Sequence, residues 1–182
     1  MDPRPPGVPP LPPEDHRCGG CRMDYATLGV QQALGMIREV PGAARAVVDA
    51  LPRPALQQRP REGTWSVTEY VCHLRDVYVT STIRLHRART EERPVLEPML
   101  NDLRARRFRY NSRDVRPVLD ELADAAAGCC DEAGRVGVAG WDRVVTRLPG
   151  EERTARWLLR QAAHEGVHHL RDLHDVAHAV AP

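Results

Sequence analysis

The stretch Gln161-Ala-Ala-His-Glu-Gly-Val-His-His-Leu-Arg-Asp172 combines a helical pattern with side chains that bind metals. Its histidines His164 and His168 are four residues apart, so on an α-helix both imidazoles project from one face and can converge on one ion. An aromatic ring and several ligand types share a single stripe of this helix: Trp157, Gln161, His164, His168 and Asp172. A stripe of this kind is typical of a helix that faces a polar pocket inside a helical bundle.

Apolar residues at helical intervals predict four long helices, at about residues 25–50, 66–90, 114–134 and 154–179. The second begins at Ser66, and Glu69 three residues later completes a capping box. Thr154 is a candidate cap for the last. The stretch 101–116 is ambiguous, residues 134–150 read as a loop, and we find no clean alternation of a strand. The predicted fold is all-α, a four-helix bundle.

The N-terminal part of the chain has a different composition from the rest. Seven of the first 15 residues are prolines, so we expect residues 1–17 to form a disordered or polyproline II tail. A Cys-x2-Cys knuckle follows at residues 18–24, and the bundle is expected to span residues 25–180.

Composition excludes several classes of function. The 26 basic residues, all arginine, nearly balance 25 acidic ones, and a net charge of +1 gives no signal for nucleic-acid binding. Without lysine, Schiff-base chemistry on a lysine is excluded. No apolar run approaches the roughly 20 residues of a membrane span, and the N-terminus does not resemble a signal peptide. We therefore expect a cytoplasmic protein that binds neither nucleic acid nor membrane.

A third histidine, His73, ends the motif Gly63-Thr-Trp-Ser-Val-Thr-Glu-Tyr-Val-Cys-His-Leu-Arg-Asp76 on the second predicted helix. His73, His164 and His168 together would form a site of three protein ligands, which leaves a coordination position open as catalytic metals require. The alternative is a set of histidines on an ordinary solvated helix, because His169, His174 and His178 are present on the last helix too.

The two motifs match, in order and spacing, the DinB/YfiT-like superfamily, which the chain resembles over about residues 25–178. The resemblance implies a four-helix bundle, often a dimer, with a divalent metal held by three histidines. Carried onto this chain, these ligands are His73, His164 and His168. Zinc is the first expectation for the metal, with nickel or iron as alternatives.

The resemblance also implies an activity. Many members are similar to thiol S-transferases that use bacillithiol or mycothiol. We therefore expect a metal-dependent transferase that activates a low-molecular-weight thiol, with mycothiol as the candidate, for attack on a small electrophile. The alternatives are a metal-dependent hydrolase or isomerase on the same scaffold, and a stress or resistance protein that binds a metal or small ligand without turnover.

Two branches of the superfamily fit less well. Mycothiol-dependent maleylpyruvate isomerases usually have a glutamate among their metal ligands and a further C-terminal domain. We assign His164 to that ligand position, and no such domain follows in this sequence. The branch of ergothioneine-forming sulfoxide synthases is expected to carry a His-x3-His-x-Glu pattern. In this chain, the last position of that pattern is Leu170.

Other residues are candidates for supporting roles. Glu69, Glu165 and Asp172 could orient ligand imidazoles, although the capping box already explains Glu69. A cluster of arginines near Phe108 could bind an anionic cosubstrate, with a solvated surface segment as the favoured alternative. The members that we select are Arg104, Arg107 and Arg109.

The five cysteines give a weaker signal. Cys18-x2-Cys21 has the spacing of half a zinc knuckle, with His16 available as a third ligand, but no second half follows it. A structural metal, a redox pair and inert thiols all remain open. Cys72, Cys129 and Cys130 read as packing residues.

Overall fold

A computed structural model describes residues 8–148 and 150–181 of the chain. Four long helices confirm the predicted all-α bundle: α1 (Val30–Asp49), α3 (Val67–Thr90), α5 (Val115–Gly134) and α6 (Ala155–Val180). The shorter elements are α2 (Arg53–Leu56), α4 (Asn101–Arg107), the 3-10 helices η1 (Tyr110–Ser112) and η2 (Val138–Asp142), and the strands β1 (Val144–Thr146) and β2 (Glu152–Thr154). Among the described residues, no helix is both long and apolar enough to cross a bilayer.

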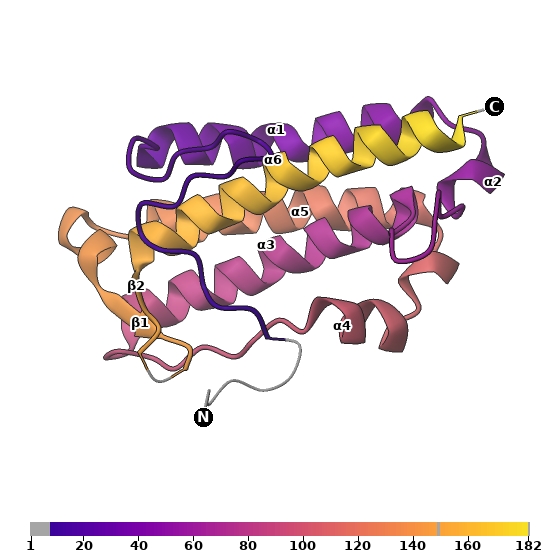
Figure 1. Cartoon of the computed structure of the whole chain (residues 1–182). Helices are drawn as coiled ribbons and strands as arrows, with labels where there is room; N and C mark the ends of the chain where they lie inside the picture. The colour runs from indigo at the N-terminus through magenta and orange to yellow at the C-terminus, as the bar shows by residue number, and fades with distance from the viewer. Residues whose placement is uncertain (1–7, 149, 182) are drawn as a thin grey trace.

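The order of the helices in the bundle places α6 between α1 and α3. Helix α6 packs against α1 and α3, and α5 packs against the same two helices. Helices α1 and α6 run in one direction, whereas α3 and α5 run in the other (Figure 1). Because α3 and α5 are parallel, residues 91–114 must cross back along the outside of the bundle. Helix α4 lies in this crossing segment.

Local capping explains where three of the long helices begin. Ser66 accepts a hydrogen bond from the Glu69 amide at 3.2 Å, and the Glu69 carboxylate accepts one from the Ser66 amide at 2.9 Å. This capping box is the predicted one. Thr154 caps α6, as expected, and Asp114 caps α5.

Two sequence expectations need correction. Helix α1 begins at Val30 rather than near Tyr25. Pro41 lies inside α1, where a proline is expected to kink or end a helix, but the helix continues to Asp49. Residues 134–150 are not a plain loop, because β1 begins there and pairs with β2 in an antiparallel hairpin. Each strand has three residues, which is too short to show an alternating pattern in the sequence.

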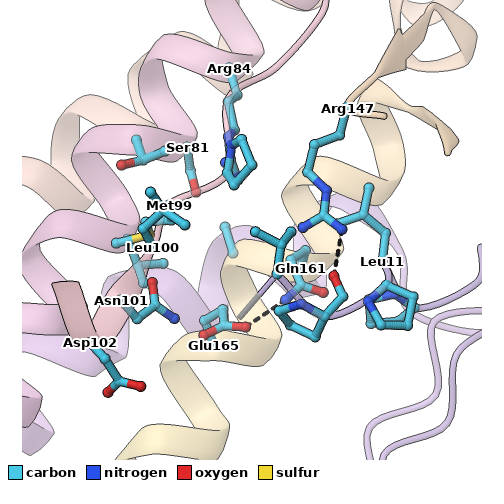
Figure 2. Close-up of a pocket in the computed structure, with 18 of the residues that line it drawn as sticks. Leu11, Ser81, Arg84, Met99, Leu100, Asn101, Asp102, Arg147, Gln161 and Glu165 are labelled. Carbon is cyan, nitrogen blue, oxygen red and sulfur yellow. Dashed lines mark hydrogen bonds between the residues drawn. The ribbon is translucent and has the colours of Figure 1, made fainter. Parts of the chain in front are cut away.

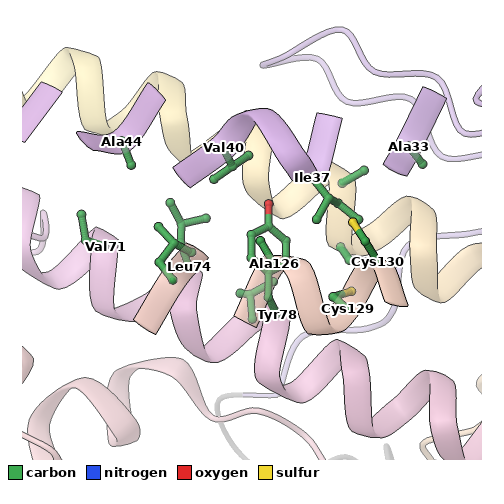
Figure 3. Packing of buried hydrophobic residues seen from close by; sticks show 14 of the residues in the cluster. Ala33, Ile37, Val40, Ala44, Val71, Leu74, Tyr78, Ala126, Cys129 and Cys130 are labelled. Carbon is green, nitrogen blue, oxygen red and sulfur yellow. The ribbon is translucent and has the colours of Figure 1, made fainter. Parts of the chain in front are cut away.

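The core of the bundle sets the rotation of α6. Side chains from three helices interdigitate there, among them Ile37, Val40, Leu74 and Tyr78 (Figure 3). Gly166 of α6 lies directly against this layer, because a Cβ atom at that position would be 2.2 Å from Tyr78 Oη and 2.8 Å from Val40 Cγ2. The glycine therefore faces the core, and the residues that flank it in the helix project to either side.

The proline-rich segment is packed along the part that the structure describes. Arg147, Arg153 and the indole of Trp157 donate hydrogen bonds of 2.6–3.1 Å to backbone carbonyl oxygens within residues 9–13. We call residues 8–17 the N-terminal strap. The expected tail at residues 1–17 is therefore not free over residues 8–17, while residues 1–7 lie outside the described residues.

Candidate metal centres

Helix α6 carries two groups of metal-ligand side chains. In the pocket cluster, His73 of α3 meets Glu165 and His169 of α6. In the knuckle cluster, Cys18 and Cys21 from the N-terminal segment meet the His164 and His168 side chains of α6. Within each cluster, one ligand atom from every residue lies within 4.8 Å of the others.

The structure does not bring together the predicted set of His73, His164 and His168, because it divides these residues between the two clusters. Successive residues of an α-helix point about 100° apart, so Glu165 and His169 face α3 when Gly166 faces the core. Both pairs have the same four-residue spacing. Spacing alone could therefore not distinguish them, and the packing of Gly166 decides.

In the pocket cluster, one carboxylate oxygen of Glu165 lies between two imidazoles. Glu165 Oε2 is 3.2 Å from His169 Nε2 and 3.5 Å from His73 Nε2. The second distance is too long for a good hydrogen bond. Across residues 8–148 and 150–181, His73 is one of the few buried side chains whose polar atoms have no hydrogen-bond partner. Two imidazoles and a carboxylate suit a divalent transition metal, which would satisfy a His73 nitrogen and keep positions open.

Charges around the pocket cluster favour a cation. Burial lowers the pKa of His73, so that its imidazole is neutral and able to act as a ligand. Burial also acts to lower the pKa of His169, but Asp172 and Glu165 raise that pKa to about 9. The imidazoles of His169 and His73 hold the pKa of Glu165 below its ordinary value against the opposite effect of burial. A metal ion would take the place of the His169 proton.

Residues outside the pocket cluster orient its ligands. Asp172 Oδ2 lies 2.7 Å from His169 Nδ1, which turns Nε2 of that ring toward Glu165. Asp172 Oδ2 is 4.0 Å from His168 Nε2, so its close contact is with His169 and not with His168. Glu69 is bound by Arg59 at 2.5 and 2.9 Å in addition to its capping box, and it belongs to neither cluster.

A hydrogen-bonded chain that the sequence did not indicate reaches Glu165 from the other side. The Tyr25 hydroxyl donates to Gln161 Oε1 at 2.7 Å, and Gln161 Nε2 donates to Glu165 Oε1 at 2.5 Å. Gln161 stood in the predicted polar stripe of α6, but Tyr25 carried no signal. The two bonds fix the second oxygen of the Glu165 carboxylate.

A pocket with a volume of about 850 Å³ opens beside Glu165. It is lined by the N-terminal strap, α3, α4, α6 and the segment before α4. Arg84 and Arg147 reach into it from the side opposite Glu165 (Figure 2), and Arg106 lines it as well. Burial lowers the pKa of Arg84 to about 10, which leaves the guanidinium charged at neutral pH.

The arginines selected from the sequence do not line this pocket. Arg104 is held by Asp76, to which it donates at 2.6 and 3.0 Å, while Arg107 and Arg109 are exposed. The pocket arginines come from three distant parts of the sequence, so their meeting depends on the tertiary fold.

The knuckle cluster is a compact group of four donors. Cys18 Sγ lies 3.4 Å from His168 Nδ1. His16, the third ligand expected for the knuckle, stacks edge-on against the Tyr25 and His164 rings and is not part of the group. Burial lowers the pKa of His164 to about 4, so this imidazole is also neutral.

Known proteins share both the sequence pattern and the fold. The chain is 31% identical over 90 residues to a provisionally named metal-dependent hydrolase of Geobacillus thermodenitrificans, covering 50% of this chain and 51% of the relative. It is 33% identical over 63 residues to Bacillus subtilis YfiT, another hydrolase so named, covering 35% of each protein. The matched part spans about half or less of these relatives.

Two solved structures are similar to the whole bundle. Bacillus subtilis YfiT, described as a probable metal-dependent hydrolase with an unusual four-helix bundle topology, superposes with a TM-score of 0.76 at 19% identity, over 82% of this chain and 86% of YfiT. A mycothiol-dependent maleylpyruvate isomerase superposes with a TM-score of 0.66 at 16% identity, over 83% of this chain and 63% of the isomerase. At these identities the similarity concerns the fold.

A family model matches a longer part of the chain than the individual relatives do. The model of the DinB superfamily matches residues 36–173, which include the four long helices except the ends of α1 and α6. This range contains all three residues of the pocket cluster. The chain belongs to the DinB superfamily.

Proposed function

We propose that the protein is a metal-dependent transferase that activates a low-molecular-weight thiol, with mycothiol as the candidate, for attack on a small electrophile. The observation that carries this proposal is the position of Glu165, which belongs to the pocket cluster and also lines the pocket. A metal at the cluster would therefore be next to the bound substrate. We expect zinc there, with nickel or iron as alternatives, because imidazole and carboxylate ligands accept all three.

A divalent ion held by His73, Glu165 and His169 would act as a Lewis acid that lowers the pKa of a coordinated thiol or water. The protein itself supplies the orientation. Asp172 holds the His169 ring and Gln161 holds the Glu165 carboxylate, so that both ligands are fixed before substrate binds. The buried, neutral His73 imidazole needs no proton removed before it acts as a ligand.

The pocket supports a small anionic substrate. Its volume of about 850 Å³ falls in the range of small-molecule sites. The side chains of Arg84, Arg106 and Arg147 line it, and Arg147 is already paired with Glu151 at 2.8 Å. Guanidinium groups bind carboxylates and phosphates well, so they would favour an electrophile that carries an acidic group. Mycothiol itself is uncharged, and its hydroxyl groups would accept hydrogen bonds from the same guanidinium groups. The N-terminal strap forms one wall.

Two related activities would use the same centre. Hydrolysis is supported by the names of the sequence relatives, because the ion that lowers the pKa of a thiol also lowers that of water. Isomerisation gains support from Glu165, since a glutamate among the ligands is what the isomerase branch is expected to have. In the structure Glu165, and not His164, lies with His73 and His169. A binding protein without turnover has less support, because the cluster opens on a pocket. The homodimer stays a prediction.

The proposal is tested by metal analysis together with two activity assays. Wild-type protein, His73→Ala and the control His174→Ala, which changes an exposed histidine of α6, would be purified without added metal. Each would be assayed for consumption of mycothiol with a panel of alkyl halides, epoxides and activated alkenes, and for hydrolysis of simple esters and amides.

We expect His73→Ala to lose one metal equivalent and all thiol consumption, while His174→Ala behaves as wild type. Hydrolysis without thiol consumption would replace the transferase by the hydrolase. Full metal content in His73→Ala would contradict the pocket cluster as the centre.

A further inference from the structure

The knuckle cluster joins two sequence motifs that are far apart. The Cys-x2-Cys pair is at residues 18–21, and the histidine pair is at residues 164–168. Each pair has a spacing that allows both side chains to bind one metal ion, and the fold places the two pairs face to face. The half of the site that was missing from the knuckle sequence is thus supplied by α6.

The backbone of the knuckle is folded to hold both sulfurs in place. Arg17 and Asp24 pair as an antiparallel bridge, the Cys18 amide donates to Met23 O at 2.9 Å, and the Arg22 amide donates to Cys18 O at 2.9 Å. Arg22 has φ at 63°, a left-handed conformation that costs energy for a residue with a side chain. The turn is therefore a tight one that surrounding contacts maintain.

The fit between the knuckle and α6 is close. A Cβ atom added at Gly20 would lie 2.9 Å from Cε1 of His168, so any larger residue at this position would require the ring to shift. The neighbouring Gly19 has nothing within 4 Å of such an atom. The contact is thus local to the side of the knuckle that faces the histidines.

His164 supplies an independent indication of a ligand. In the part of the chain that the structure describes, both of its ring nitrogens are buried without a hydrogen-bond partner. Burying such groups without a partner is destabilising, and the polar groups of proteins are seldom left so. Its neighbours are the rings of Tyr25 and His16, with centroids 5.7 and 5.5 Å away. Coordination through one nitrogen would satisfy the ring.

We propose that Cys18, Cys21, His164 and His168 bind a structural zinc ion, distinct from the metal of the pocket cluster. Two thiolates and two imidazoles are a donor set that selects zinc, and four protein ligands complete its tetrahedral shell. With no position open, this ion would not bind substrate. The redox and inert-thiol interpretations of the knuckle explain neither the two histidines nor the buried nitrogens of His164.

The role of this zinc would be to anchor the N-terminal strap. The strap ends at the knuckle, and Tyr25, directly beyond the knuckle, begins the hydrogen-bonded chain through Gln161 to Glu165. Zinc would therefore fix a wall of the pocket and, through Tyr25, one oxygen of a pocket ligand. The residues of the knuckle cluster are positioning residues for the reaction.

The main test uses the adjacent histidines of α6. Wild-type protein, His168→Ala, His169→Ala and the double variant Cys18→Ser/Cys21→Ser would be purified under reducing conditions without added metal. We expect two metal equivalents in the wild type and one in each of the others. Cys130→Ala, which removes a buried thiol elsewhere, is the control and should keep both equivalents.

X-ray absorption at the zinc edge tells which ion remains. In His169→Ala we expect Zn–S distances of about 2.3 Å and Zn–N distances of about 2.0 Å, with two sulfurs per zinc. In His168→Ala and in the cysteine double variant the two-sulfur shell should be gone. Zinc without sulfur neighbours in His169→Ala, or no zinc at all, would overturn the proposal of a structural zinc. The proposed function would be unaffected by that result, because it depends on the metal of the pocket cluster.

Trypsin gives a readout that works even if a variant folds poorly. Arg17 and Arg22 flank the knuckle and are exposed. In wild-type protein, a chelator that removes zinc should increase the rate of cleavage at these two sites at least tenfold, measured relative to the rate at arginines of the helical bundle. Adding back zinc alone should reverse the effect. Equal cleavage rates with and without zinc would contradict the anchoring role.

Discussion

The pocket cluster and the knuckle cluster use the same helix with the same four-residue spacing, offset by one residue. They differ in what the neighbouring segment contributes. Helix α3 adds a single imidazole to the pocket cluster, whereas the knuckle adds two sulfurs. With a metal bound, the first set would leave coordination positions open beside a pocket, and the second would fill a tetrahedral shell. The segment that faces α6, and not α6 itself, would then determine which centre is open to substrate.

The largest expected difference between the clusters comes from changing adjacent residues of α6. Glu165→Gln removes the carboxylate that lies between His73 and His169, and we expect it to lose the pocket metal and to lower kcat/KM at least about 1000-fold, equivalent to about 4 kcal/mol. His164→Gln should lose the knuckle zinc and lower kcat/KM only about tenfold. Metal stoichiometry and kinetics on both variants would measure this. Equal losses in the two variants would mean that the clusters act as one centre.

Gly166→Ala should damage both clusters, because it displaces the helix that they share. The added Cβ would meet Tyr78 Oη and Val40 Cγ2, and overpacking of this kind costs about 3 kcal/mol. The substitution Tyr78→Phe removes the nearest atom and should recover part of the loss. Urea unfolding of the single and double variants would show this coupling.

Gly35→Ala in α1 is the matched control for Gly166→Ala, because nothing lies within 4 Å of its added Cβ. It should stabilise the protein by about 0.5–1 kcal/mol. If Gly166→Ala were as well tolerated, the close approach of α6 to the core would not be what orients the two clusters.

Asp172→Asn should have a smaller effect, and only on the pocket cluster. It weakens the contact that orients His169, and loss of such a contact lowers metal affinity about 10–100-fold. The knuckle zinc should be retained with unchanged affinity, because His168 lies farther from Asp172. Competition with a chelator, followed separately for the two metal equivalents, is the measurement. A loss confined to the knuckle zinc would reverse our assignment of Asp172.

Gly20→Ala is expected to have the smallest effect, and only on the knuckle cluster. Its Cβ would press on the edge of the His168 ring, which can give way by a small rotation. We expect zinc affinity to fall about fivefold, or roughly 1 kcal/mol. Gly19→Ala, where the added atom meets nothing, should bind zinc as the wild type does. Identical affinities in both variants would argue against the close fit of knuckle and histidine.

Much of the fold could be predicted because its signals are local. Ser66 and Glu69 fix the start of α3, and Thr154 fixes that of α6, through contacts within four residues of the chain. His73 was selected from a motif on one helix, and it does lie in a cluster. These inferences needed no knowledge of how the helices pack.

The remaining features depend on contacts between distant segments. The spacing of His164 and His168 equals that of Glu165 and His169, and the packing of α6 on the core, with Gly166 against Tyr78, decides which pair faces α3. The partners of the knuckle cysteines are more than a hundred residues away, so the sequence around them looked incomplete. The proline content likewise predicts a disordered or polyproline II tail, and it cannot reveal that distant arginines bind the carbonyl oxygens of this segment.

The hydrogen bonds of the N-terminal strap have a consequence for how this protein can vary. Arg147, Arg153 and Trp157 bind backbone oxygens there, which every amino acid possesses. Related proteins could therefore replace most strap residues without loss, provided that the chain stays extended. A single inserted or deleted residue would instead shift every carbonyl from its donor. Length, more than residue identity, is what selection would have to preserve in this segment.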